Sequence, residues 1–150
     1  MPKTVSEARS LARCLIDTAH RFGLKTSALI TDMSQPLGNA VGNISEIHEA
    51  LNAIRTGFPS RLIELTTQLA SELLQLSNQT VSPDEIRQKL LSGETLERLQ
   101  QMIEAQGGRL QDLPELNWHP VRATQSGYLA NVHNDIIGQL ITDMGGGRVG

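Results

Sequence analysis

The residues best suited to chemistry lie in one loop and in the helix predicted to follow it. Residues 30–43 read ITDMSQPLGNAVGN, an apolar run that stops at Asp32 and gives way to a turn at Leu37–Ala40. Glu49 comes one helical turn after Glu46 in the next segment. Turn carbonyls and one carboxylate are hard oxygen ligands, which suit a weakly held cation better than a soft transition metal. The residue types therefore offer a candidate cation site here.

Other residues that could do chemistry have simpler interpretations. Gly145–Gly147 with Arg148 could form a phosphate-binding nest. The favoured interpretation is that these glycines form a helix C-cap and a turn. The carboxylate pairs, Asp84 with Glu85 and Glu46 with Glu49, lie near helix starts, where acidic residues favour the dipole. No P-loop, GxSxG or GxGxxG motif is present. The histidines are scattered without metal-ligand spacing: His20, His48, His119 and His133.

Helices dominate the elements that must position these residues. Capping signatures and apolar periodicity predict helices at 4–22, 43–57, 60–76, 82–91, 92–106 and 134–141. The apolar run of residues 25–31 predicts a buried strand, and residues 121–132 predict two short strands broken at Ser126-Gly127. A lone strand pair cannot bury its own apolar face, so we expect this chain to be part of something larger. The predicted fold is α/β, rich in helices and with few strands.

Composition narrows the class of protein. The chain has 150 residues, 39% of them hydrophobic but only 3% aromatic, and a net charge of −3. No basic block indicates a nucleic acid or an anionic membrane as a partner, and no signal peptide or membrane-spanning run is expected. The single cysteine, Cys14, lies on an apolar helical stripe and is predicted to be a buried structural thiol. A lone cysteine fits a reducing compartment, and we expect a cytoplasmic protein.

The sequence resembles the pyrimidine-nucleoside phosphorylases, the family of thymidine phosphorylase. The resemblance rests on KTSALITDMSQPLGNAVGNISEIHEAL at 25–51, on MIEAQGG at 102–108 and on GYLANVHNDIIGQLITDMGGGR at 127–148. It implies a slice of the family's large α/β domain at 1–107, a linker at 108–120 and the start of a β-containing C-terminal region at 121–150. These bounds are expectations that the resemblance supports.

The resemblance also implies a function in nucleoside salvage. The family are pentosyltransferases that cleave a pyrimidine nucleoside with inorganic phosphate, giving free base and pentose 1-phosphate. Its Lys-His-Ser-Thr-Gly-Gly segment is absent here, and neither Lys25 nor Lys89 matches a family motif. We therefore expect no catalytic or substrate-binding residue in this chain, no cofactor, and no activity of the chain alone. The family's homodimer is formed by a helical domain that this sequence does not match.

One family site does map onto the chain. The resemblance assigns a structural monovalent or calcium-like cation to the carbonyls of Leu37 and Ala40 and the carboxylate of Glu49, with two further ligands from the absent phosphate loop. Asp32 is expected to shape the loop by accepting backbone hydrogen bonds. Two alternatives stay open: a non-catalytic remnant or orphan α/β module, and an enzyme resembling AMP phosphorylase. The M-S-Q-P form favours the bacterial pyrimidine branch over the second.

Overall fold

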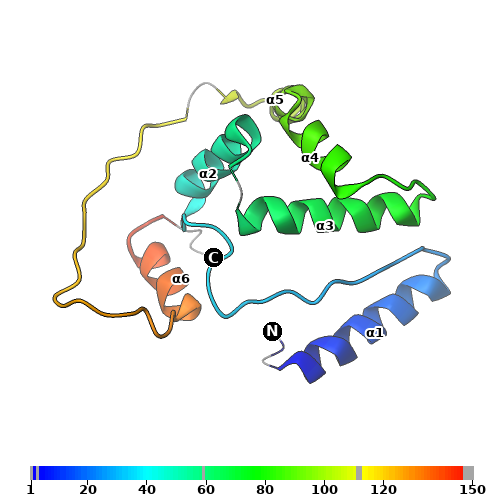
Figure 1. The fold of residues 1–150 in the computed structure, drawn as a ribbon, viewed down its shortest axis with the longest axis horizontal. Coiled ribbons are helices and arrows are strands. Elements are labelled where there is room, and N and C mark those ends of the chain that lie inside the picture. Colours follow the sequence, from blue (N-terminus) through cyan, green and yellow to red (C-terminus); the bar gives the residue numbers. More distant parts are fainter. Residues whose placement is uncertain (1, 3, 59, 111–112, 147–150) are drawn as a thin grey trace.

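The computed structural model describes residues 2, 4–58, 60–110 and 113–146 (Figure 1). The regular secondary structure of this part of the chain consists of helices, joined by irregular connections. In chain order the helices are α1 (Val5–Arg21), α2 (Asn43–Thr56), α3 (Arg61–Leu76), α4 (Pro83–Leu91), α5 (Glu94–Ala105) and α6 (Asn134–Asp143). No helix among the described residues is long and apolar enough to cross a membrane.

Helix α1 forms because its ends are capped and its apolar residues recur at helical spacing. The Thr4 hydroxyl accepts the Glu7 N–H at 3.2 Å, and the chain leaves the helix through Gly23 at a φ of +72°. The apolar stripe is uncovered, however, with Leu11 and Leu15 47% and 60% exposed. Cys14 is exposed for the same reason, so the prediction of a buried thiol was wrong.

Helices α2, α3, α4 and α5 pack together and hold the small core of the described residues. Helix α4 contacts each of the other helices in this group. The buried side chains are Leu51 and Ala53 on α2, Ile86 on α4, and Thr67 on α3. We call this group the helical cluster.

Two helix caps predicted within the helical cluster differ in how well they agree with the structure. The one at Ser82 is confirmed: its hydroxyl accepts the Glu85 N–H, the Glu85 carboxylate accepts the Ser82 N–H, and Pro83 opens α4. The one at Asn43 is displaced by a residue, because Asn43 is already helical and Gly42 is the cap. Glu46 then accepts the Gly42 N–H at 3.0 Å, so the carboxylate caps the helix without a hydroxyl partner.

The predicted strands at 25–31 and 121–132 are not formed in the described part of the chain. A strand needs a neighbour for its backbone N–H and C=O groups, and no described residue pairs with these segments through the backbone. The α/β prediction is therefore confirmed only as helix-rich. The predicted β-containing segment at 121–150 has no strand in the part that the structure describes, residues 121–146.

Two long connections link the helices. Residues 24–33, which we call the 24–33 segment, run between α1 and α3 in Figure 1. The Ser27 hydroxyl donates to the Glu72 carboxylate on α3 at 2.7 Å. The second connection leaves α5, loops away from the cluster and returns to α6 (Figure 1). Its contact with α2 is a hydrogen bond of 2.9 Å between His48 Nε2 and the Pro114 carbonyl. The domain bounds at 108–120 stay a prediction.

Candidate functional site around the 32–42 loop

The loop of residues 32–42 forms one wall of an open cleft of about 910 Å³. The other walls come from α2, which follows the loop directly, from Leu62 on α3, and from α6, which lies about 90 residues further along the sequence. Its lining includes the charged side chains Asp32, Glu46 and Glu49 and the apolar side chains of Leu37, Ile47 and Ile137. The sequence predicted the loop and α2 as parts of a site, but not α6.

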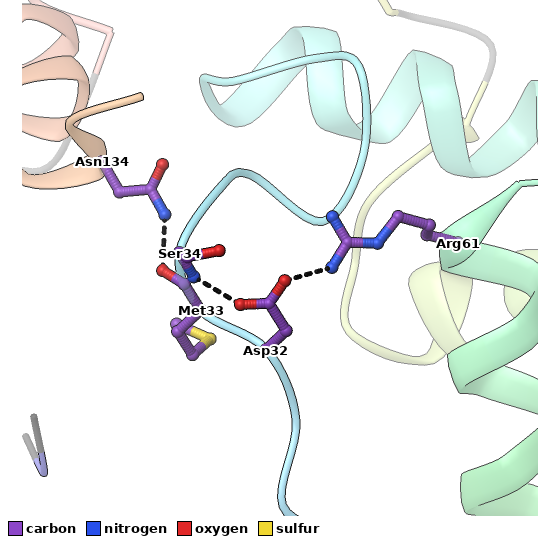
Figure 2. A network of polar contacts seen from close by, with 5 residues as sticks. All are labelled: Asp32, Met33, Ser34, Arg61 and Asn134. Carbon is purple, nitrogen blue, oxygen red and sulfur yellow. Dashed lines mark hydrogen bonds and ion pairs between the residues drawn. The ribbon is translucent and has the colours of Figure 1, made fainter. Parts of the chain in front are cut away.

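Asp32 fixes the entry to this loop, as the sequence predicted. One carboxylate oxygen accepts the Ser34 N–H at 2.8 Å, and the other lies 3.3 Å from the Arg61 guanidinium on α3 (Figure 2). The Ser34 N–H, and to a lesser extent Arg61, hold the pKa of the Asp32 carboxyl below its usual value. Asp32 is therefore an ionised anchor that ties the loop to the start of α3.

Glu49 fixes the turn in the middle of the loop. Its two carboxylate oxygens accept the N–H groups of Asn39 and Ala40, at 2.7 and 3.0 Å. The carboxylate lies so close to Gly38 that a Cβ added there would be 2.2 Å from Glu49 Oε2. A side chain at position 38 would therefore displace the Glu49 carboxylate from the place where it accepts these two N–H groups.

The structure brings the predicted cation ligands to one cleft, since Leu37, Ala40 and Glu49 all line it. Carbonyl oxygens and one carboxylate have the chemistry for a hard cation, but three donors fall short of the six to eight oxygens that Ca²⁺ takes. Both Glu49 oxygens also hold backbone N–H groups, although each has a further lone pair. The residues fit such a cation only with ligands from elsewhere, and the site stays a prediction.

Asn134, at the start of α6, is the residue that sequence reasoning missed. The sequence predicts Asn134 or Asp135 as the cap of this helix, but His133 occupies that position. The Asn134 side chain instead donates to the Met33 carbonyl at 2.8 Å, across 101 residues of sequence (Figure 2). Its Oδ1 is buried and accepts no hydrogen bond from the described residues. No local pattern could have indicated a contact between residues so distant in sequence.

The remaining candidates do not assemble into a site. Nowhere in the described ranges do three His, Cys, Asp or Glu side chains group as metal ligands. Gly145 has a φ of +79° and its N–H donates to Thr142, which supports the C-cap reading of the glycine run. Arg148 lies outside the described residues. Lys89 pairs with Glu94, and Lys25 donates to Asn78, so each lysine has a structural partner.

The curated proteins that are most informative for this chain share one family name. No family model matches the chain. A pyrimidine-nucleoside phosphorylase of Staphylococcus epidermidis is 33% identical over 157 aligned residues, which include 97% of this chain and 36% of the relative. One from Staphylococcus aureus strain USA300 is 32% identical over 98% of the chain and 36% of the relative. This chain thus spans little more than a third of the length of these curated relatives. The resemblance is confirmed: along almost its whole length, the chain is homologous to one part of the pyrimidine-nucleoside phosphorylases.

Proposed function

We propose that this chain supplies one part of a pyrimidine-nucleoside phosphorylase, which cleaves pyrimidine nucleosides with inorganic phosphate to base and pentose 1-phosphate. The observation that carries the proposal is the similarity to proteins of that name over 97% of the chain. The hydrogen bonds made by Asp32, Glu46 and Glu49 support it, because they hold the 32–42 loop in a defined conformation beside a cleft.

The chain alone is inactive under this proposal. Phosphate binding calls for cationic side chains or several free N–H donors. The described lining of the cleft contains three carboxylates, Asp32, Glu46 and Glu49, and no Lys, Arg or His. These carboxylates would repel phosphate, so its binding groups must come from another part of the enzyme. The role of this chain is then to hold the 32–42 loop in the conformation that contacts the phosphate-binding part of the enzyme.

The cation belongs to the same proposal. In the complete enzyme the carbonyls of Leu37 and Ala40 and the carboxylate of Glu49 would share a monovalent or calcium-like cation with ligands from the phosphate-binding part. The cation would link the two parts through ionic bonds and would take no direct part in cleavage of the nucleoside. Dimerisation would likewise depend on segments outside the region of similarity.

The test is a phosphorolysis assay with thymidine, uridine and AMP as separate substrates. The purified chain should release no base, with or without phosphate. A fusion is then made in which this chain replaces the matched segment of the Staphylococcus epidermidis relative. The fusion should release thymine or uracil only when phosphate is present. Turnover by the chain alone would contradict the inactive state. A folded fusion without turnover would favour a non-catalytic module, and cleavage of AMP alone would favour the other substrate class.

A further inference from the structure

The side chain of Asn134 contacts the 32–42 loop and does not cap its own helix. His133 is the N-cap residue of α6, and no side-chain hydrogen bond caps that end of the helix. Asn134 is half-buried, and its Nδ2 donates to the Met33 carbonyl at 2.8 Å. Its Oδ1 is buried and accepts no hydrogen bond from the described residues. A carbonyl can only accept, so the contact with Met33 fixes which way the side-chain amide points.

Met33 and Ser34 share one peptide group, and both polar ends of that group are bound. The Met33 C=O accepts from Asn134 on α6, and the Ser34 N–H donates to the Asp32 carboxylate at 2.8 Å. The other Asp32 oxygen pairs with Arg61 on α3. Figure 2 shows Asn134 on one side of this peptide group and the pair of Asp32 and Arg61 on the other. These contacts form one series that runs from α6 through the loop to α3.

The planarity of the peptide bond links the two hydrogen bonds. Its C=O and N–H groups turn together, so a rotation that releases the Met33 carbonyl also moves the Ser34 N–H away from Asp32. Hydrogen bonds in series polarise one another, so the bond from Asn134 also strengthens the Ser34 N–H as a donor. No hydrogen bond among the described residues joins Asn134 directly to Asp32. We therefore expect Asn134 to act on that carboxylate through the shared peptide.

Helix α6 also reaches the far end of the loop. A Cβ added at Gly42 would lie 3.7 Å from Ile141 Cγ2, which is an ordinary contact distance. Asn134 and Ile141 are seven residues apart, and Ile137 between them lines the cleft. Residues at spacings of three, four and seven share one face of a helix. One face of α6 thus spans the 32–42 loop, with Asn134 as a polar contact at one end and Ile141 as an apolar contact at the other.

We propose that Asn134 is a positioning residue, which sets the plane of the Met33–Ser34 peptide from α6 and through that plane holds Asp32 against α3. It thereby fixes the entry to the 32–42 loop. If Asn134 only started α6, the effects of its replacement would be confined to that helix. The consequence for the reaction rests on the proposed function, in which this loop has to keep the conformation that contacts the phosphate-binding part of the enzyme.

The first test is Asn134→Ala in the 150-residue chain, followed by NMR. The Ser34 amide should exchange about fivefold faster, a factor that corresponds to the usual net contribution of one hydrogen bond. The pKa of Asp32 should rise, because the Ser34 N–H that holds it down is a weaker donor. Helical circular dichroism and amide exchange in the helical cluster should not change. An unchanged exchange rate at Ser34, or an unchanged pKa of Asp32, would overturn the proposal.

Asn134→Asp separates the positioning role from a role in starting the helix. An acidic residue is favourable in the first turn, so a residue that only started α6 would leave the helix unchanged or more stable in this variant. The new carboxylate has no N–H to donate to the Met33 carbonyl, so we expect faster exchange at Ser34 here too. Asn131→Asp is the matched control for charge, since Asn131 lies beside His133 and not beside the loop. Equal exchange at Ser34 in the two Asp variants would contradict the proposal.

A double-mutant cycle tests whether the effect passes through the peptide group. Asp32→Ala removes the acceptor of the Ser34 N–H. In that background, Asn134→Ala should change the exchange of Ser34 by less than about twofold, because no bond is left to weaken. Two independent contacts would instead give the same increase in both backgrounds. That additive result would exclude the coupling.

The fusion with the Staphylococcus epidermidis relative tests the consequence for the reaction. There Asn134→Ala should raise the KM for phosphate about fivefold and change the KM for the nucleoside by less than about twofold. An active fusion with an unchanged KM for phosphate would overturn the positioning role. A fusion without turnover, beside a chain whose Ser34 amide responds as expected, would contradict the proposed function and leave the positioning role intact. Turnover with an unresponsive Ser34 amide would do the reverse.

Discussion

The helical cluster and the region of α1 with the 24–33 segment are built from similar residues but differ in what covers them. In the cluster, α4 contacts α2, α3 and α5, and the apolar side chains of Leu51 and Ile86 are buried. On α1, the equally apolar Leu15 is 60% exposed. Both regions have capped helices and helical periodicity. The difference shows that local pattern forms a helix, whereas burial depends on which other elements are present.

The largest expected effect is at the centre of the cluster. Ile86→Ala should lower the free energy of unfolding by about 2–4 kcal/mol, because it removes buried methyl groups and leaves a cavity. Leu15→Ala on α1 should change it by less than about 0.5 kcal/mol, because the side chain is already in water. Urea unfolding followed by circular dichroism measures both. Similar losses for the two variants would mean that α1 is packed in solution and would remove the contrast.

The contact between Glu49 and the 38–40 turn is the next test. Glu49→Gln replaces one accepting oxygen with an NH₂ group, so one of the N–H groups of Asn39 and Ala40 loses its partner. The cost of about 1–2 kcal/mol should speed the hydrogen exchange of these amides by roughly 5- to 30-fold. Glu46→Gln is the matched control, since its effect should fall on the Gly42 amide. Unchanged exchange at residues 39 and 40 would show that Glu49 does not hold the turn.

The end of α2 tests the cluster at a backbone position. Gly57 has a φ of +63°, and an added Cβ would lie 2.6 Å from Leu91 Cδ1. Gly57→Ala should therefore destabilise the cluster by about 1 kcal/mol in a thermal melt. Gly127→Ala, in the open connection, meets no atom within 4 Å and should not lower the melting temperature. Equal shifts for both variants would contradict the difference between packed and open regions.

The smallest effect concerns the ionisation of Asp32. Its pKa is lowered in the folded chain, so its contribution to stability is present above the unfolded pKa and is lost as the pH falls through the folded value. Arg61→Gln should raise the pKa of Asp32 by a small amount, because the Ser34 N–H makes the larger contribution. A carboxyl titration by NMR measures this shift. Replacement of Arg87, which pairs with Asp84, should leave Asp32 unchanged.

The sequence predicts helices and local hydrogen bonds. It does not predict strand pairing or burial, which depend on segments far away in the sequence. All six helices among the described residues were predicted, and the hydrogen bond from Ser34 to Asp32 was expected. The strand at 25–31 was predicted from an apolar run, but a strand exists only with a neighbour, which the described residues do not supply. The prediction that Cys14 is buried was wrong for a related reason, because no described element covers that face of α1. The link from Asn134 to Met33 has no local signature at all.

That link also bears on the order in which the chain folds. Each helix closes hydrogen bonds between residues four apart, which takes about a microsecond or less. The bond between Asn134 and Met33 closes a loop of 101 residues, and the entropy lost on closing a loop grows with its length. Helix α6 should therefore reach the 32–42 loop only after the helices of the cluster have formed. The cleft between them is the last part of the molecule to acquire its shape.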